Sequence, residues 1–214
     1  MNKIIIIGGE GTAVNIAEAL SDAINNYHYD AEFLGFANDN IEKEYINGIP
    51  ICTKITEINK YYQYNDVKFI YALYKPGFMR ERAALLKKLA IPYDSMINFI
   101  HPLSYVSSSI KLGKGNVILA NSTIQNNVIL GMNNIINSNV AIEHETNLGN
   151  SNFVSAGVVL GSKVHLSNEC FIGLNSSVRE NVIIEDNVFI GMNSLLLSDC
   201  KENEIWYGVP AKRR

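Results

Sequence analysis

The chain has 214 residues and a formal net charge of −3, with 18 Lys and Arg against 21 Asp and Glu. This length suits one large domain or two small ones, and the charge excludes a nucleic-acid binder with a concentrated basic surface. The apolar run at residues 4–7 ends at Gly8 and Gly9, too short for a signal peptide or membrane span. We therefore expect a soluble, cytoplasmic globular protein. Its odd number of cysteines, with no metal-like spacing, argues against a disulfide framework; they are Cys52, Cys170 and Cys200.

Residues 1–98 alternate between strand and helix patterns. Residues 3–7 form a short apolar run bounded by glycines, as expected of a buried parallel strand. Residues 14–24 carry apolar side chains at helical spacing, and residues 33–36 have the pattern of a second strand. A third strand is expected over residues 68–73 and a second helix over residues 80–89. This order predicts a small parallel α/β domain over residues 1–98.

In residues 106–196, every sixth residue is Leu, Ile or Val, and we call these the periodic residues. Residues four positions after each periodic residue are also restricted, mostly to Val, small residues or Asn, and glycine directly follows the periodic residue six times. This period fits neither an amphipathic helix nor an alternating strand. It predicts a parallel β-helix, a prism with triangular coils of 18 residues, about five of which fit here. The periodic positions, all Leu, Ile or Val, are Val106, Leu112, Ile118, Ile124, Leu130, Ile136, Ile142, Leu148, Val154, Leu160, Leu166, Ile172, Val178, Ile184, Ile190 and Leu196.

Two short segments flank the repeat: Phe-Ile-His-Pro at residues 99–102 and Tyr-Gly-Val-Pro-Ala-Lys at residues 207–212. With these segments the chain resembles the hexapeptide-repeat sugar acyltransferases, and in particular the nucleotide-sugar N-acetyltransferases of the bacillosamine and perosamine pathways. The resemblance implies a Rossmann-like nucleotide-sugar-binding domain over residues 1–98 and a left-handed parallel β-helix over residues 99–214. It also implies acetyl-coenzyme A as co-substrate, no metal, and a homotrimer with active sites between adjacent prisms.

His144 is the candidate catalytic base. It lies two residues after a periodic position, so its side chain is expected to point outward, and Glu145 can orient the imidazole and favour its cation. A solvent-exposed histidine beside acids is the alternative. The resemblance implies that His144 is the base, Glu145 its support and Asn137 a residue near that base. The other histidines are expected to be structural at His101, in a turn at His165 and exposed at His28.

The resemblance also implies a coenzyme A groove along the prism. Its implied contact residues are Gly173, Leu174, Gly191 and Met192 for the pantetheine and Lys212 for the phosphates. For Arg213 and Arg214, phosphate contact and a frayed C-terminus are equal alternatives.

One position departs from the bacillosamine enzyme, where a second histidine contacts the thioester. Here that position is Phe153, whose ring donates no hydrogen bond. We therefore expect a backbone N–H near Gly161 or Ser162 to polarise the thioester.

The loop at residues 8–13 joins the first strand to the first helix, and such N–H groups suit phosphate. It lacks the full GxGxxG spacing, which excludes NAD. The resemblance implies nucleotide contacts at Glu10, Gly11, Thr12, Asn38, Asp39 and Tyr74. Tyr74 stands where the family has glycine and could stack on a base or block the site, and Asn38 replaces an acid. The nucleotide therefore stays open.

The leading hypothesis is an acetyl-coenzyme A-dependent N-acetyltransferase acting on a nucleotide-linked amino sugar of the UDP-4-amino-sugar type, in surface glycan biosynthesis. His144 would act as base for direct transfer. The first alternative is O-acetylation, or transfer of another acyl group to a sugar hydroxyl. The second is a non-catalytic β-helix that binds sugar nucleotides or serves as a scaffold.

Overall fold

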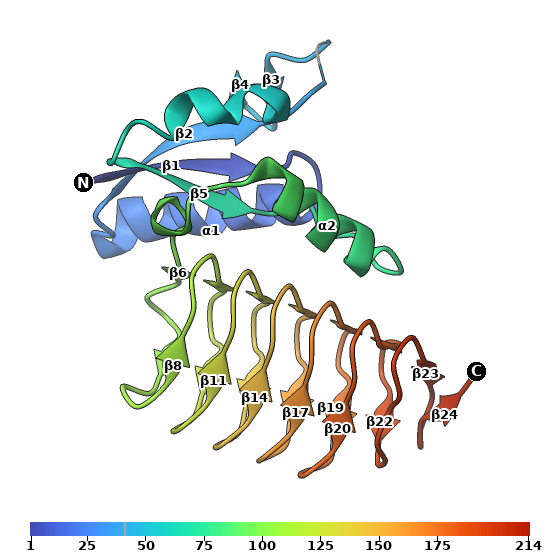
Figure 1. The fold of residues 1–214 in the computed structure, drawn as a ribbon. Helices are drawn as coiled ribbons and strands as arrows, with labels where there is room; N and C mark the ends of the chain where they lie inside the picture. Colours follow the sequence, from blue (N-terminus) through green and yellow to red (C-terminus); the bar gives the residue numbers. More distant parts are fainter. Residues whose placement is uncertain (41) are drawn as a thin grey trace.

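The computed structural model describes residues 1–40 and 42–214, and an α/β half packs along the side of a triangular prism (Figure 1). The α/β half has one sheet in the order β3-β4-β2-β1-β5, parallel except for the β3–β4 hairpin. Its strands are β1 (Asn2–Ile7), β2 (Ala31–Ala37), β3 (Tyr45–Ile46), β4 (Ile49–Thr53) and β5 (Val67–Tyr71). Its helices are α1 (Thr12–Tyr27), α2 (Met79–Leu89) and two 3₁₀ helices, Ile55–Tyr61 and Tyr93–Ser95.

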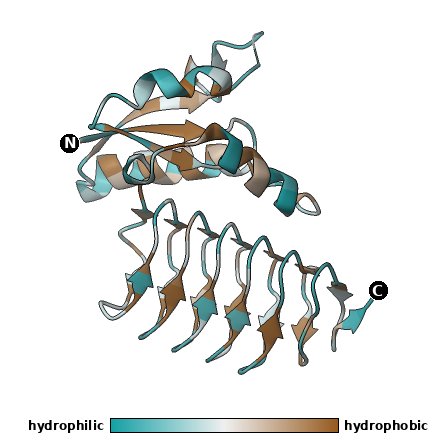
Figure 2. Ribbon diagram, in the orientation of Figure 1, coloured by the Kyte–Doolittle hydropathy of each residue, from teal (hydrophilic) through white to brown (hydrophobic). Residues whose placement is uncertain are grey.

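Strand β1 explains why this half needs helices on both faces of its sheet. Ile4 and Ile6 pack into a core that contains the apolar side of α1, whereas Ile5 and Ile7 pack with residues of α2 and the first 3₁₀ helix. All four isoleucines are fully buried, and the part of β1 that they form is hydrophobic throughout (Figure 2). A strand buried on both faces is typical of parallel sheets, as the sequence predicts for residues 3–7.

The prism has three faces, each a sheet of short strands. The first face contains β6 (Phe99–Ile100), β9 (Val117–Ile118), β12 (Ile135–Ile136), β15 (Phe153–Val154), β18 (Phe171–Ile172), β21 (Phe189–Ile190), β23 (Ile205–Tyr207) and the antiparallel β24 (Lys212–Arg213). The second face contains β7 (Tyr105–Val106), β10 (Thr123–Ile124), β13 (Ala141–Ile142), β16 (Val159–Leu160), β19 (Ser177–Val178) and β22 (Leu195–Leu196). The third face contains β8 (Lys111–Leu112), β11 (Ile129–Leu130), β14 (Asn147–Leu148), β17 (His165–Leu166) and β20 (Ile183–Ile184).

The strand register confirms the predicted coil of 18 residues. Thr123 pairs with Ala141, Ala141 pairs with Val159, and the other two faces repeat the same offset. Fourteen of the sixteen periodic residues are buried, and the two half-buried ones, Val106 and Leu112, lie in the first coil at the open end. The parallel sheets fit a left-handed β-helix of the acetyltransferase type. Strands β6 and β23 extend the prism beyond the predicted repeat.

Buried asparagines occupy one column of the prism interior. The backbone N–H of Asn134 donates to Asn116 Oδ1, and that of Asn152 donates to Asn134 Oδ1, each at 3.0 Å. Their side-chain Nδ2 groups donate to carbonyl oxygens of the neighbouring coils. Because every amide has partners, these polar side chains can be buried without the cost of an unmade hydrogen bond.

The corners of the prism turn through residues with positive φ, which Asn tolerates better than most residues. We number the corners by the faces they join: the first corner leads from the first to the second face, the second from the second to the third, and the third from the third to the first. Glu145 (φ 60), Lys163 (φ 59) and Glu169 (φ 61) occupy this conformation although their side chains do not favour it. The asparagines that occupy it in the repeat are Asn121, Asn127, Asn133, Asn139, Asn175, Asn181, Asn187 and Asn193.

The two halves share a hydrophobic interface. Phe99, Val117 and Ile135, on the outer side of the first face, are fully buried in the same core as α1. Beside this core, His101 is buried, its Nε2 lies 3.1 Å from Asp22 Oδ2, and its Nδ1 accepts the N–H of Leu103. The structural role predicted for His101 is therefore confirmed.

Several local expectations need correction. The two main helices and the first two strands are longer than predicted, and the sequence reading missed β3, β4 and both 3₁₀ helices. His165 lies in strand β17 rather than in a turn, because it is the outward-facing residue before the buried Leu166. His28 is exposed, as expected, and ends α1 with a φ of 56°. Among the described residues, no helix is both long and apolar enough to cross a bilayer.

Candidate functional site

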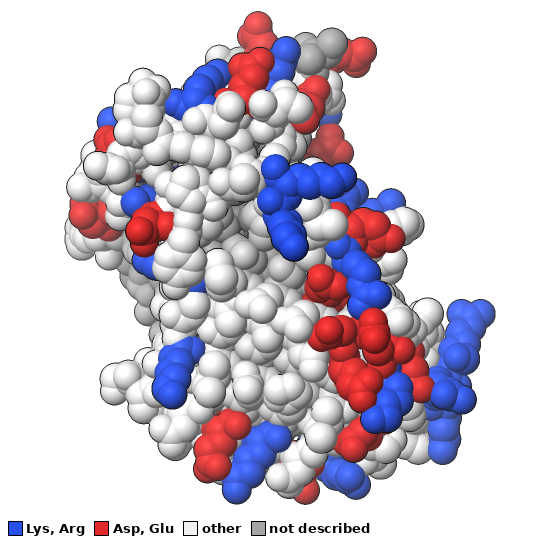
Figure 3. Space-filling model, in the orientation of Figure 1, with Lys and Arg blue, Asp and Glu red and all other residues white. Residues whose placement is uncertain are grey.

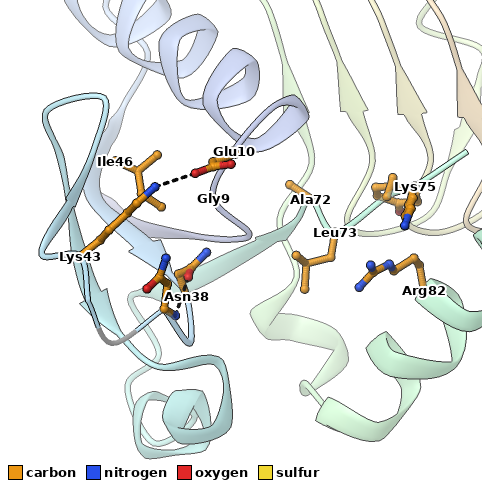
Figure 4. Close-up of a pocket in the computed structure, with 11 residues that line it drawn as sticks. Gly9, Glu10, Asn38, Lys43, Ile46, Ala72, Leu73, Lys75 and Arg82 are labelled. Carbon is orange, nitrogen blue, oxygen red and sulfur yellow. Dashed lines mark hydrogen bonds and ion pairs between the residues drawn. The ribbon is translucent and has the colours of Figure 1, made fainter.

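A cavity of about 360 Å³ opens at the carboxyl ends of β1, β2 and β5 (Figure 4). Crevices at this edge of parallel sheets are the usual ligand sites of α/β folds, because loops and helix N-termini converge there. Helix α1 begins directly after the loop that follows β1. The lining residues are Gly9, Glu10, Asn38, Asn40, Lys43, Ile46, Ala72, Leu73, Tyr74, Lys75 and Arg82.

The charges around this cavity favour an anion. Lys43 Nζ lies 2.7 Å from Glu10 Oε1, and this hydrogen bond and charge hold the pKa of Glu10 below its ordinary value. Lys75 and Arg82 line the opposite side, next to α2 (Figure 4). Three cations therefore face one carboxylate, which Lys43 already neutralises. Such a surplus suits a phosphate group.

The structure brings only part of the predicted nucleotide site to this cavity. Glu10, Asn38 and Tyr74 line it, whereas Gly11 and Thr12 do not. Asp39 lies outside the lining, and its Oδ1 accepts the N–H groups of the first 3₁₀ helix at 2.8 and 3.3 Å. Oδ1 of Asp39 is thus engaged as a cap, and the nucleotide contact expected of this residue stays a prediction. Sequence reasoning missed Lys43, Lys75 and Arg82, which come from three different segments.

Tyr74 joins the cavity to the prism. Its hydroxyl donates to the backbone oxygen of Asn133 at the third corner, and its ring lies against those of Tyr71 and Phe153, with centroids 5.6 and 5.9 Å away. Burial raises the pKa of its hydroxyl. Tyr74 is therefore a wall of the cavity whose polar end is already engaged.

His144 lies on the second corner, with its side chain 43% exposed. Its Nδ1 is 3.3 Å from Glu145 Oε1, so Glu145 orients the imidazole as predicted and Nε2 is left for another partner. Lys163, one coil further on, lies 3.6 Å from the other oxygen of Glu145. Lys163 was missed, although its spacing of 18 residues from Glu145 places it at the same corner position.

The coil that follows His144 contains the two backbone N–H groups that were expected to polarise the thioester. Gly161 and Ser162 follow Glu143 and His144 by one coil. The Gly161 N–H donates to the Val178 oxygen at 2.9 Å, whereas the Ser162 N–H has no partner among the described residues. The Gly161 N–H is therefore engaged in a hydrogen bond between coils, and the Ser162 N–H is the one left to contact a ligand.

The remaining predicted acyl-transfer residues do not lie beside His144 in one chain. Asn137 is on the first corner, where its Nδ2 donates to the Val154 oxygen at 3.0 Å. Phe153 is on the first face, opposite the second corner, and stacks on Phe171 with centroids 5.5 Å apart. The second face separates the first corner from His144.

The first corner carries the predicted pantetheine residues. Leu174 and Met192 are exposed apolar side chains, 49% and 71% accessible, at equivalent positions of neighbouring coils. A Cβ at Gly173 would collide with the backbone of Met192, and one at Gly191 with the ring of Tyr207. Tight stacking therefore explains both glycines, and the predicted pantetheine contacts of these four residues stay a prediction.

The C-terminal strand is anchored. Lys212 pairs with Tyr207 in the β23–β24 hairpin and its side chain is exposed. Arg213 Nη1 lies 2.8 Å from Glu204 Oε1, and the Arg214 N–H donates to the Ile205 oxygen. A frayed end, one of the two alternatives considered for these arginines, is therefore wrong.

A second cavity, of about 510 Å³, lies between α1 and the first corner. Asn15, Glu18 and Asp22 of α1 line one side, and Asn137 and Ser138 line the other. Among residues 1–40 and 42–214, no cluster of three metal-ligating side chains occurs.

The fold is that of sugar N-acetyltransferases. No protein-family model matches the chain, and a search of curated proteins gives no match. The acetyltransferase domain of PglB from Neisseria gonorrhoeae, in complex with acetyl coenzyme A, is 23% identical with a TM-score of 0.88, covering 100% of both chains. PerB from Caulobacter crescentus, in complex with CoA and GDP-perosamine, is 23% identical with a TM-score of 0.85, covering 100% of this chain and 98% of its own. WeeI from Acinetobacter baumannii is 15% identical with a TM-score of 0.79, covering 100% of both.

Proposed function

We propose that the protein is an acetyl-coenzyme A-dependent N-acetyltransferase acting on a nucleotide-linked amino sugar. The observation that carries the proposal is the His144–Glu145 pair, held on an exposed prism corner with Nε2 unengaged. The fold supports it, because PglB and PerB are similar over their full length and were crystallised with acetyl coenzyme A, or with CoA and GDP-perosamine. PerB was also crystallised with one histidine replaced by Asn or by Ala.

In this proposal acetyl-coenzyme A supplies the acetyl group as a thioester. A sugar that arrives as the ammonium first loses a proton to solvent, and His144 Nε2 then accepts a second proton from the neutral amine as its nitrogen attacks the carbonyl carbon. Glu145 holds the imidazole through Nδ1 and stabilises the imidazolium that forms. When the carbon–sulfur bond breaks, the imidazolium returns a proton to the leaving sulfur. The Ser162 N–H is our candidate donor to the oxyanion.

Direct transfer agrees with the state of the cysteines. Burial raises the pKa of Cys170 to about 12 and that of Cys200 to about 12, so both thiols stay protonated near neutral pH. Burial also raises the pKa of Cys52, which lies in the α/β half, away from the second corner. These thiols are poor nucleophiles, and we propose no acyl-enzyme.

We propose that the α/β half is a Rossmann-like domain, residues 1–98, that binds the nucleotide in the cavity at the strand ends. Lys75 and Arg82 would neutralise the diphosphate, and the 360 Å³ cavity has room for part of a nucleotide. The UDP type is our expectation among the possible nucleotides. A cytoplasmic location and a role in surface glycan biosynthesis are part of the same proposal.

We propose a homotrimer, with residues 99–214 forming left-handed prisms side by side. The second face supports this arrangement, because its outward residues carry no charge and it separates His144 from the first corner. Packing this face on a second copy would bring His144 of one subunit toward Asn137 and Leu174 of the next. The outward residues are Tyr105, Thr123, Ala141, Val159, Ser177 and Leu195.

An acetyl-transfer assay with His144→Ala tests the proposal. The substrates are acetyl-coenzyme A and a panel of UDP-, GDP- and dTDP-linked amino sugars, with thiol release and product mass as readouts. We expect a loss of about 10²- to 10⁴-fold, and full activity for the control His165→Ala, which removes an exposed histidine from the third face. Near wild-type activity in His144→Ala would reject the mechanism.

The same assay separates the alternatives. Acetylation of sugar hydroxyls but not amines would identify an O-acetyltransferase. A chain that binds nucleotides but gives no thermal shift with coenzyme A would be a non-catalytic scaffold.

A further inference from the structure

Arg80, at the start of α2, binds the third corner of the prism through all three guanidinium nitrogens. Its Nε lies 3.0 Å from Glu169 Oε2, its Nη2 2.8 Å from Glu202 Oε1, and its Nη1 3.3 Å from Asn203 Oδ1. The partners are 89 to 123 residues away in the chain and belong to two coils. Figure 3 shows acidic side chains of the prism gathered next to the basic side chains of α2. This contact therefore joins the two halves at a second place, away from the α1 core.

The segment held by this contact is the connection between β5 and α2, residues 72–78. Four lining residues of the cavity come from its first part, residues 72–75, and Arg82 follows one turn into α2. Tyr74 fixes the start of the connection through Asn133, which is also on the third corner. At its end, Met79 is 3% exposed and lines a small cavity together with Phe171 and Phe189 of the first face. Two of the three cations of the cavity, Lys75 and Arg82, thus lie on or directly after a connection that contacts the prism near both of its ends.

The backbone of Glu169 indicates that this contact has been selected at a cost. The third corner uses Asn133, Ser151, Asn187 and Asn203 for its left-handed residues, and Glu169, a charged residue with a long side chain, takes the same conformation at φ 61. A residue other than Gly, Asn or Asp loses roughly 1–2 kcal/mol there. Strain of this kind persists where the side chain serves a purpose, and the recorded partner of the Glu169 carboxylate is Arg80.

We propose that Arg80 is a positioning residue: by binding the third corner it holds residues 72–78 and the start of α2 so that Lys75 and Arg82 face the cavity. The prism thereby shapes the anion site of the other half. The inference rests on the proposed function for the identity of the ligand, but the positioning itself is independent of it.

Two variants test this role in the full-length protein. Arg80→Gln removes the charge, and Glu169→Asn removes one carboxylate while installing the residue that the corner prefers. The readouts are hydrogen–deuterium exchange of residues 72–78 and the affinities for UDP, GDP and coenzyme A, measured by calorimetry. Lys88→Gln, an equal charge change on the exposed side of α2, is the control.

We expect both variants to exchange faster in residues 72–78, by about 3-fold or more, and to bind the nucleotide about 3- to 10-fold more weakly, as fits loss of an exposed ion-pair network. Coenzyme A affinity should be unchanged, and the melting temperature of Glu169→Asn should not fall. Lys88→Gln should behave as the wild type.

Two results would overturn the inference: unchanged exchange in both variants, or the same change in Lys88→Gln. Failure of the wild type to bind UDP or GDP would instead contradict the proposed nucleotide site. In that case exchange alone still decides the role of Arg80.

Discussion

In the α/β half, the cations that line the cavity lie on ordinary backbone: Lys43, Lys75 and Arg82 have no positive φ. In the prism, the carboxylate that contacts His144 and the lysine that contacts that carboxylate lie at left-handed corner positions, where Glu145 and Lys163 replace the usual Asn. The difference follows from how the two halves are built. Strand ends and loops offer many relaxed positions, whereas every residue of a prism coil has a fixed place, and an outward group beside His144 has only the corner available.

This contrast implies opposite relations between stability and function in the two halves. Replacing a corner residue by Asn should relieve strain while removing a functional group. Replacing a cavity cation offers no such relief. The predictions below measure the contrast.

Among the variants that measure this contrast, Glu145→Asn has the largest expected effect. Loss of the carboxylate removes the support of the imidazole, so kcat should fall about 10- to 100-fold in the acetyl-transfer assay. Because Asn fits the left-handed corner, the free energy of unfolding should rise by about 1 kcal/mol. The matched control is Asn181→Glu, the reverse change on the same corner two coils away from Glu145, which should lower stability by a similar amount and change kcat less than about threefold. If Glu145→Asn instead lowered the free energy of unfolding, Glu145 would not be strained at this corner and the proposed contrast between the two halves would fail.

The second effect concerns the cavity. Lys75→Ala and Arg82→Ala should each weaken binding of the preferred nucleotide about 10-fold, because a charge-assisted contact with a phosphate contributes about 1.5 kcal/mol or more. Neither variant should gain stability. Calorimetry and chemical denaturation of the same samples measure both quantities. Unchanged nucleotide affinity in both variants would show that the phosphate binds elsewhere.

The two halves also differ in how much of their structure can be predicted from the sequence, and this difference follows from the same difference in construction. Leu160 and Leu166 can be assigned to the prism core from periodicity alone, because a coil of 18 residues repeats the same environment at the same place. The outward direction of His144 and its pairing with Glu145 follow from the same counting. The period says nothing about strain, so Glu145 and Lys163 cannot be recognised as unusual until their φ angles are known.

Contacts between the halves escape prediction for another reason. Tyr74 and Asn133 are 59 residues apart, and Arg80 and Glu169 are 89 apart, with no periodic relation between the members of either pair. From its sequence position alone, Tyr74 could either stack on a base or block the site. Only the docking of the two halves decides that its hydroxyl binds the prism. The cations of the cavity were missed because three separate segments supply them.

The smallest expected effect is that of Lys163→Asn. Lys163 lies 3.6 Å from Glu145 Oε2, the oxygen that does not face His144, and both side chains are about half exposed, so solvent screens the pair. Asn at this corner should raise the free energy of unfolding by about 1 kcal/mol, while kcat changes less than about threefold. Denaturation and the transfer assay measure the two effects. A loss of kcat as large as that of Glu145→Asn would mean that the carboxylate orients His144 only while the lysine holds it. The functional unit on the corner would then comprise all three residues, and the contrast between strained corners and relaxed cavity residues would extend over two coils instead of one.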